Sequence, residues 1–291
     1  MNARLQRLWV LVRLTLAVAV GWLAGWGWGV MTLLLQSAVL ALGFVQLRWV
    51  NQPAPGWGQL LRAWAGEAVA SELAFSWRQP WREWAIPDHL PAGATQGVLL
   101  VHGFSCNRGR WNGWMRRLRQ AGVAFVAPSL EPAFGSIDDY ADEIEAGVRR
   151  LQALTGRMPV VCAHSMGGLA LRAWWRKHGA GHAVAPRAIT LGSPHQGTRM
   201  AALGVGVNAA QMRRGSAWLA ALPGLPDADC FWTPCDQVVN PAPTALLPGA
   251  RAHRVDAVGH MGLVHSRQAW ELLQAALQAP PAGAPVPGGP A

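Results

Sequence analysis

The sequence contains few of the residues that mark a nucleic-acid-binding protein. Among 291 residues there is a single lysine, Lys177, so the formal net charge of +10 is carried almost wholly by arginine. The arginines are scattered, and no basic run alternates with aromatic residues, which argues against a nucleic-acid partner. Several arginines flank an apolar N-terminus, so the charge favours binding to anionic lipid. The bias toward Ala, Arg, Gly and Pro is typical of a GC-rich bacterial genome.

Cysteine is also scarce. The four cysteines, Cys106, Cys162, Cys230 and Cys235, lack the spacing and the interleaved histidines of a zinc site, so we predict no bound metal. Cys162 falls in a strand-like run, where we expect a small buried hydrophobe. In an extended strand Cys230 and Cys235 are about 16 Å apart, against the roughly 6 Å between Cα atoms that a disulfide allows. We predict free thiols there, although a turn at residues 233–234 leaves a bridge open.

Charged residues are absent between Arg13 and Arg48. As one helix this stretch would be roughly 50 Å long, whereas a hydrocarbon core is about 30 Å thick. The glycines of residues 21–29 lie near its middle, so the sequence favours a hairpin of two transmembrane helices, about residues 8–24 and 30–49, over a single transmembrane segment. Four tryptophans fall near the expected interfaces: Trp22, Trp26, Trp28 and Trp49. A cleaved signal peptide fits less well, because its apolar core is usually about 7 to 15 residues long.

Both flanks of the apolar stretch carry positive charge. Arg4, Arg7 and Arg13 precede it, and Arg48 and Arg62 follow it. Positive flanks are expected on the cytoplasmic side, and a hairpin places both of them there. We therefore predict a protein of the bacterial inner membrane whose folded domain faces the cytoplasm. A single span would place that domain outside.

The chain divides into four parts by composition. We expect a membrane anchor at residues 1–50, a linker and an amphipathic helix at residues 51–76, a folded domain at residues 77–278, and a disordered Pro/Gly/Ala tail at residues 279–291. The amphipathic helix has apolar residues at helical spacing and is expected to dock on the membrane or on the domain. At 51% hydrophobic residues, the chain can bury the core of one domain.

Strand-like and helix-like segments alternate within the folded domain. Strands are predicted from residue 97 and at residues 123–130, 159–165, 187–193, 230–236 and 253–260, and helices at residues 111–122, 137–156, 167–179 and 266–278. Such alternation predicts a mostly parallel sheet with helices on both faces.

One serine lies between a predicted strand and a predicted helix. In AHSMGG, Ser165 has Ala163 two residues before it and Gly167 two residues after it, which matches G-x-S-x-G with alanine for the first glycine. A sharp turn from strand to helix needs small residues at these positions, and it exposes the serine hydroxyl above the sheet. Because serine is a weak nucleophile by itself, this interpretation requires a base and an acid that orients the base. A serine that merely caps a buried helix is the alternative.

A second motif supports the nucleophile. VLLVHGF, residues 98–104, is a strand that runs into His-Gly. In acyl-transfer enzymes a backbone N–H of this loop and the N–H of the residue after the nucleophile stabilise the oxyanion, and here these residues are Phe104 and Met166. His102 and His164 adjoin the turns that they help to form, so neither is expected to be the base.

These motifs together resemble the α/β-hydrolase fold, and within it the bacterial triacylglycerol lipase and esterase group. The matching segments, in chain order, are LLVHGF, EPAFGSIDDYA, VVCAHSMGGLALRAW, LGSPHQGT, CDQVVNP and VGHMGLV, and they extend from about Trp77 to the last helix. The resemblance implies an α/β-hydrolase domain that cleaves acyl esters, lipids in particular, and it does not include the N-terminal apolar stretch.

The family order of serine, acid and histidine selects the partners of Ser165. The resemblance implies Asp236 as the acid, since it follows a predicted strand, and His260 as the base, since it stands just past the last strand. Three other carboxylates are rivals for this role: Asp227 and Asp229, expected before their strand, and Asp256, expected within the next strand. His265 is the chief rival base, and His253 is expected at the opposite end of the sheet.

The implied mechanism needs no metal and no organic cofactor. Ser165 attacks an ester carbonyl, His260 moves the proton, and water cleaves the acyl-enzyme. His195 in GSPHQGT is expected to be structural, and residues 200–229 have the position of a lid, or of an ordinary surface insertion. An acyltransferase with the same triad and a non-catalytic binding protein of this fold remain alternatives. The sequence gives no oligomeric state.

Overall fold

The computed structural model describes residues 1–279, so the predicted disordered tail lies outside the described residues apart from its first position. Within this range one parallel sheet has the strand order β2-β1-β3-β4-β5-β6. Its strands are β1 (Gly97–Val101), β2 (Ala124–Val126), β3 (Val160–His164), β4 (Arg187–Leu191), β5 (Asp227–Trp232) and β6 (Arg251–Arg254). The predicted parallel sheet is confirmed.

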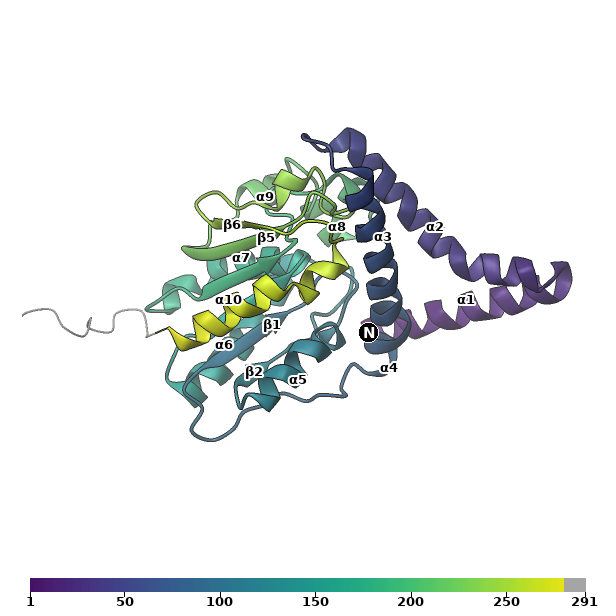
Figure 1. Cartoon of the computed structure of the whole chain (residues 1–291). Helices are drawn as coiled ribbons and strands as arrows, with labels where there is room; N and C mark the ends of the chain where they lie inside the picture. The colour runs from purple at the N-terminus through teal and green to yellow at the C-terminus, as the bar shows by residue number, and fades with distance from the viewer. Residues whose placement is uncertain (280–291) are drawn as a thin grey trace, which may run out of the picture.

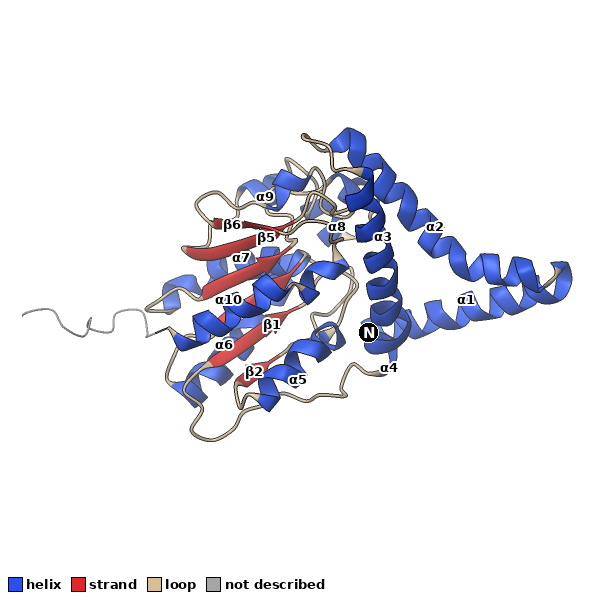
Figure 2. Cartoon of the chain, viewed as in Figure 1, coloured by secondary structure: helices blue, strands red, loops and turns tan. Residues whose placement is uncertain are grey.

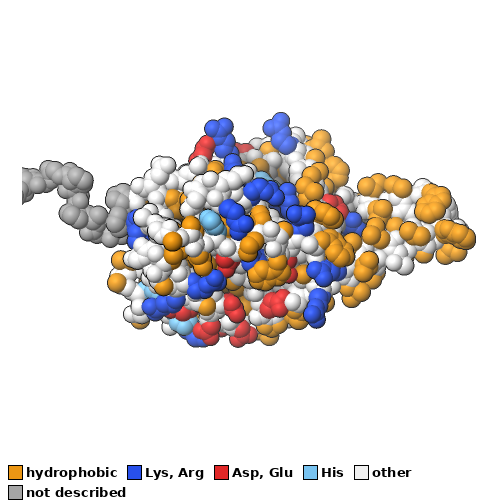
Figure 3. Space-filling view, turned by 90° about the horizontal axis from the view of Figure 1, so that it is seen from below, with side chains coloured by type: hydrophobic (Ala, Val, Ile, Leu, Met, Phe, Trp, Pro, Cys, Tyr) orange, Lys and Arg blue, Asp and Glu red, His pale blue; other side chains and the backbone are white. Residues whose placement is uncertain are grey.

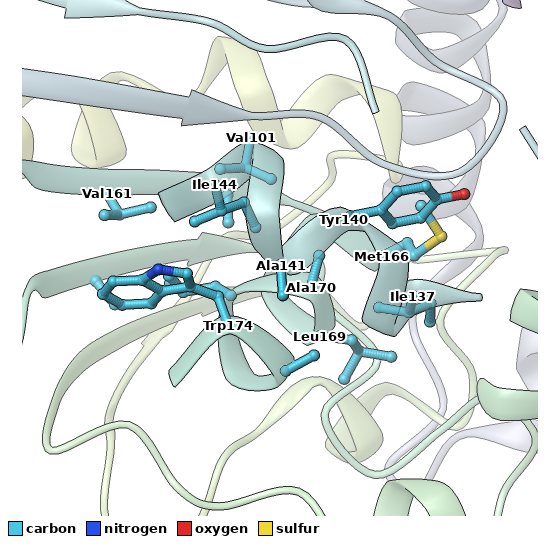
Figure 4. Packing of buried hydrophobic residues seen from close by; sticks show 14 of the residues in the cluster. Val101, Ile137, Tyr140, Ala141, Ile144, Val161, Met166, Leu169, Ala170 and Trp174 are labelled. Carbon is cyan, nitrogen blue, oxygen red and sulfur yellow. The ribbon is translucent and has the colours of Figure 1, made fainter. Parts of the chain in front are cut away.

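Helices cover both faces of the sheet (Figure 2). They are α5 (Asn112–Gln120), α6 (Ala141–Thr155), α7 (Met166–His178) and α10 (Arg267–Gln278). Trp114 of α5 and Trp270 of α10 pack on one face, and Ile144 of α6 and Trp174 of α7 pack on the other (Figure 4). Because both faces are covered, β1 and β3 are continuous buried runs rather than alternating ones.

The strand order brings two loops together. From β1 the chain moves outward to β2 and then returns to β3 on the other side of β1. In open parallel sheets the carboxyl ends of the strands form a crevice at such a reversal. The loops that follow β1 and β3, which contain Phe104 and Ser165, therefore lie side by side. A Cβ atom placed on Gly103 would lie 2.7 Å from Cβ of Ser165.

The last two strands differ from the prediction. β5 begins at Asp227 rather than at residue 230 and ends at Trp232, because a turn begins at Thr233, whose hydroxyl accepts the N–H of Cys235. β6 occupies residues 251–254 rather than 253–260. It is an edge strand with mostly exposed side chains, so it has no apolar run that the sequence could reveal.

Shorter helices connect these elements. They are η1 (Leu73–Arg78), α4 (Gln79–Trp81), η2 (Arg108–Trp111), η3 (Ile137–Tyr140), η4 (Gly179–Gly181), η5 (Arg199–Leu203), α8 (Val207–Gln211), α9 (Ala217–Ala220), η6 (Ala242–Ala245) and η7 (Met261–His265). Of these, η1 is a π-helix that continues α3 (Trp57–Glu72) directly.

The N-terminus forms a helical hairpin that projects from the domain (Figure 1). Its arms are α1 (Asn2–Ala24) and α2 (Trp26–Val50), both long and apolar enough to cross a membrane. The turn is the single residue Gly25, with φ of 105°, and is shorter than the predicted turn over residues 21–29. Both helices continue through this region because glycines permit close packing: a Cβ on Gly29 would lie 2.6 Å from the Ala17 carbonyl oxygen.

Both ends of the hairpin dock on the domain. At the start of α1, the N-terminal amino group pairs with Glu131, and Asn2 Nδ2 donates to the Cys106 carbonyl at 2.7 Å. After α2, Asn51 Nδ2 donates to the Pro234 carbonyl at 2.8 Å. In the face shown in Figure 3, the outer part of the hairpin presents hydrophobic side chains and no charged ones, and the sequence has no charged residue between Arg13 and Arg48.

Helix α3 lies between the bases of the two arms (Figure 1). Trp64 Nε1 donates to the Ser37 carbonyl of α2 at 2.9 Å, and Arg13 of α1 forms two hydrogen bonds of 2.8 Å to the Glu72 carboxylate. Apolar residues such as Trp57 and Leu61 remain exposed on its outer side. The helix therefore connects the hairpin to the domain and keeps an apolar face.

Candidate active site

Ser165 occupies a strained turn between β3 and α7. Its φ of 56° and ψ of −130° lie in a region that non-glycine residues rarely adopt, and such strain gathers at functional sites. The turn is held to the neighbouring strand because the Ser165 N–H donates to the Leu191 carbonyl of β4 at 2.9 Å. The side chain is 7% exposed.

The small residues predicted around Ser165 are required by this packing. A Cβ on Gly167 would lie 2.7 Å from the carbonyl oxygens of both Val101 and His102. Ala163, at the end of β3, is fully buried. The turn therefore has no room for larger side chains at these two positions, as predicted.

The structure brings His260 and Asp236 into contact. His260 Nδ1 lies 2.9 Å from Asp236 Oδ2, and both residues are buried. The other carboxylate oxygen of Asp236 accepts the N–H groups of Val238 (2.8 Å) and Val239 (2.7 Å). Because the carboxylate accepts, Nδ1 of the neutral imidazole carries the proton and Nε2 has a free lone pair.

His260 also lies beside the Ser165 turn. Its ring centroid is 4.7 Å from that of His164, the residue directly before Ser165, and its carbonyl oxygen lies 3.3 Å from His164 Nε2. Within residues 1–279, Ser165 Oγ makes no hydrogen bond, which is common for such hydroxyls before a substrate binds.

The surroundings of His260 shift its pKa. Burial alone lowers the pKa, but the hydrogen-bonded Asp236 carboxylate raises it, and the net result is a pKa above the ordinary value. Glu67 adds to the increase, and the Arg110 guanidinium opposes it. The imidazolium form is therefore stabilised at this position.

Three other histidines, His102, His195 and His265, lie in different surroundings. His102 Nε2 accepts the Leu130 N–H at 2.8 Å and its Nδ1 lies 2.8 Å from the Gly103 carbonyl, while burial lowers its pKa to about 4. Burial also lowers the pKa of His195 to about 3, and its Nε2 contacts Thr190 at 3.1 Å. His265 is exposed at the end of η7 rather than at the start of α10.

The rival carboxylates are engaged too, for reasons that differ from those predicted. Asp227 and Asp229 lie within β5, not before it, and Asp229 binds Arg251 and His253. His253 lies within β6, where its Nε2 is 2.7 Å from Asp229. Asp256 follows β6 instead of lying in it, and it is exposed and paired with Arg254.

Two backbone N–H groups next to Ser165 are free. Met166 is the first residue of α7, so its N–H has no partner within the helix. Phe104 follows the His-Gly turn after β1. Neither N–H donates a hydrogen bond to any residue in the described range 1–279. The Phe104 ring packs edge to face on Phe134 at 5.7 Å between centroids.

The segment predicted as a lid forms η5, α8 and α9, and its last residues, from Asp227, belong to β5. It is fastened to the domain: Asn208 Nδ2 donates to the Ala133 carbonyl at 2.8 Å, and the buried Arg172 donates to the Leu222 carbonyl at 2.9 Å. Its loop exposes Leu203 and Val205. A lid function stays a prediction.

All four cysteines are buried free thiols, which confirms the prediction for Cys230 and Cys235. Burial raises the pKa of Cys106 and of Cys235 to about 11, so neither is a thiolate near neutral pH.

Sequence reasoning missed Glu67 of α3. Its carboxylate is fully buried and accepts the N–H groups of Met261 and Gly262, directly after His260. One signal was present: Glu67 shares a helix face with the small and apolar residues Leu60, Ala63, Ala70 and Ala74, where a charge is unexpected.

Comparison with known proteins identifies the fold. No protein-family model and no curated protein sequence matches the chain. The mature Bacillus licheniformis lipase BlEst2 superposes with a TM-score of 0.55 and 18% identity over 66% of this chain and 95% of that enzyme. Aspergillus fumigatus lipase B superposes with a TM-score of 0.57 and 19% identity over 67% of this chain and 57% of its own length. The chain thus has the α/β-hydrolase fold, preceded by two apolar helices.

Proposed function

We propose that this protein is a membrane-anchored serine hydrolase that cleaves the acyl esters of lipids. The observation that carries the proposal is the buried pair of Asp236 and His260 beside the strained turn of Ser165, with Nε2 of the imidazole free. The superposition on two lipases supports an ester hydrolase of this fold.

The proposed reaction uses these residues in sequence. Nε2 of His260 takes the proton of Ser165 as Oγ attacks the ester carbonyl, and the free N–H groups of Phe104 and Met166 bind the oxyanion. The imidazolium that forms is stabilised by Asp236, and it then protonates the departing alcohol. Water then attacks the acyl-enzyme carbonyl as Nε2 of His260 takes its proton, and His260 returns that proton to Oγ of Ser165, which releases the fatty acid.

A cavity beside the proposed oxyanion loop supports a lipid substrate. It has a volume of about 270 Å³ and lies between α1 and the loops that contain Ser105 and Phe134. Its apolar lining includes Leu5, Trp9 and Ala133. Because Phe134 also packs against Phe104, the cavity adjoins the place where the ester carbonyl would bind. We assign it to an acyl chain.

The hairpin supports anchoring in a membrane. The start of α1 and the end of α2 both dock on the domain, so the two ends of the hairpin lie on the same side of it. A chain that crosses a membrane twice requires this arrangement. Trp22, Trp26 and Trp28 are exposed near the tip, and Trp49 is exposed near the base, which matches the preference of tryptophan for the two interfaces.

Covalent labelling tests the proposed activity. A fluorophosphonate probe should label the wild-type protein at one residue, because only an activated serine reacts, and Ser165→Ala should abolish both labelling and hydrolysis of p-nitrophenyl butyrate. His260→Ala should lower hydrolysis by on the order of 10³-fold or more. Labelling that persists in folded Ser165→Ala would refute the assignment. Product analysis with an added alcohol separates hydrolysis from acyl transfer.

A C-terminal fusion tests the proposed cytoplasmic location. Alkaline phosphatase is active only outside the cytoplasm, and green fluorescent protein exported by the general secretion route is dark. If the domain lies in the cytoplasm, the fusion to green fluorescent protein should be fluorescent and the fusion to alkaline phosphatase should be inactive. A strongly active phosphatase fusion would mean that the domain lies in the periplasm.

A further inference from the structure

The loop that contains His260 is held by a carboxylate from outside the sheet domain. Glu67 Oε1 accepts the Met261 N–H at 2.7 Å, and Oε2 accepts the Gly262 N–H at 3.0 Å. The side chain is 0% exposed and comes from α3, the helix that connects the hairpin to the domain. Three charge-assisted hydrogen bonds, including one from Gln237, balance the cost of burying this carboxylate.

Gln237 links this carboxylate to His260 itself. Its Nε2 donates to Glu67 Oε1 at 2.7 Å, and its Oε1 accepts the backbone N–H of His260 at 3.3 Å. Gln237 directly follows Asp236 in the chain. A hydrogen-bonded path therefore runs from α3 to the backbone of His260, through a residue that is covalently joined to Asp236.

A buried side chain of opposite charge, the guanidinium of Arg110, holds the same loop. Arg110 Nη2 donates to the Met261 carbonyl oxygen, so both backbone polar groups of Met261 are held by buried charged side chains. The loop also fits closely against Glu67, since a Cβ on Gly259 would lie 2.6 Å from Glu67 Oε2. Little movement of residues 259–262 is possible while Glu67 is in place.

We propose that Glu67 is a positioning residue, which holds the His260 loop in the geometry that lets the imidazole reach Ser165. This inference rests on the proposed function. It means that the active site is incomplete without α3, although α3 precedes the α/β-hydrolase fold. Four groups face the His260 ring or its loop and set its charge environment: Asp236, Glu67, Arg110 and His164.

Glu67→Gln is the informative variant because it keeps the shape and removes the charge. The amide has one acceptor oxygen where the carboxylate has two. Its NH2 group therefore opposes either the Gly262 N–H or the donors of Met261 and Gln237. We expect kcat for p-nitrophenyl butyrate to fall about 10- to 100-fold with KM nearly unchanged, because misplacement of a reacting group acts on the chemical step. Loss of the negative charge also lowers the pKa of His260, so the acidic limb of kcat/KM should move to lower pH.

Two further variants serve as controls. Glu72→Gln removes another carboxylate of the same helix. The Glu72 carboxylate binds Arg13 and Ser76 and makes no hydrogen bond to residues 259–262, so kcat and the pH profile of this variant should match the wild type. Glu67→Asp keeps the charge on a shorter side chain. It should lower kcat and leave the acidic limb in place, and it serves as the test if Glu67→Gln does not fold.

The outcomes separate this inference from the proposed function. A wild-type protein that neither hydrolyses the ester nor reacts with the fluorophosphonate overturns the proposed function. An active wild type with a folded Glu67→Gln variant of unchanged kcat overturns the positioning role alone. A lower kcat with an unmoved acidic limb in Glu67→Gln, or a wild-type kcat in Glu67→Asp, overturns it as well.

Discussion

Replacement of Asp236 by asparagine tests the proposed triad sharply, because neighbouring hydrogen bonds determine how the new amide must lie. Oδ1 of Asp236 accepts two backbone N–H groups, from Val238 at 2.8 Å and from Val239 at 2.7 Å, and Oδ2 accepts Nδ1–H of His260 at 2.9 Å. Asparagine has one amide oxygen, which can serve the two backbone donors or the histidine. The backbone donors cannot change, so the amide NH2 faces His260.

The size of the effect follows from this orientation. If the amide turned around, two buried N–H groups would oppose its NH2, at a cost of about 1 to 3 kcal/mol each. The imidazole instead changes tautomer, so that Nδ1 accepts and Nε2 carries the proton. An Nε2–H cannot take the proton of Ser165. In a serine triad this change lowers kcat by about 10⁴-fold, which corresponds to about 5 kcal/mol at about 1.4 kcal/mol per factor of ten.

The assay compares kcat of Asp236→Asn and Asp256→Asn on p-nitrophenyl butyrate. Asp256 is exposed, and the side chain that it binds is that of Arg254, so Asp256→Asn should retain wild-type kcat. Near-isosteric replacement should leave the melting temperature of Asp236→Asn within a few degrees, about 1 kcal/mol of stability. If folded Asp236→Asn kept kcat within tenfold of the wild type, or if Asp256→Asn lost it, Asp236 would not be the acid.

Three other predictions follow from the same geometry. Because the reaction needs neutral His260 and its pKa is raised, kcat/KM should fall as the pH drops through a midpoint above about 6.5, and a midpoint below this value would contradict the reasoning. Ala133→Phe fills part of the cavity assigned to the acyl chain, so kcat/KM should drop more for a dodecanoyl than for a butyryl ester, and equal losses would remove that assignment. Gly167→Ala puts a Cβ 2.7 Å from two carbonyl oxygens, so urea unfolding should show a loss of about 1 to 3 kcal/mol, and unchanged stability would show that the turn can relax.

The parallel sheet was predictable from local signals, whereas the pairing of Asp236 with His260 was implied by the family order of serine, acid and histidine. Buried strands read as apolar runs, and Ser165 directly follows one of them, β3. Ser165 needs small neighbours at fixed spacing, and the crowding at Gly167 shows why. The role of these residues in catalysis stays a prediction.

The edges of the sheet were less predictable. Among residues 1–279, β6 pairs with β5 alone, and it exposes most of its side chains, so nothing apolar marks residues 251–254. The apolar residues that suggested a strand up to His260 lie instead in the loop that contacts Glu67. The local sequence pattern cannot distinguish an edge strand from a buried loop, because the element that packs on a segment determines whether its apolar residues are buried.

The position of Glu67 could not be deduced from sequence. Its partners, Met261 and Gly262, offer backbone N–H groups, which every residue except proline has. Likewise, the hairpin was predicted from its lack of charge, but docking through Asn2 and Asn51 depends on the carbonyl oxygens of Cys106 and Pro234. A contact with a backbone group does not depend on the type of residue that carries the group, so the sequence of the partner segment does not reveal it.

The contact between Glu67 and Met261 spans 194 residues, and this separation sets an order of assembly. During synthesis the hairpin and α3 leave the ribosome before Ser165, and Ser165 leaves it before His260. Contacts so distant in the chain close late in folding. The growing chain therefore has the serine before it has the base, and we expect hydrolytic competence to arise only after residues 260–262 have been synthesised, when the apolar hairpin has had time to enter a bilayer.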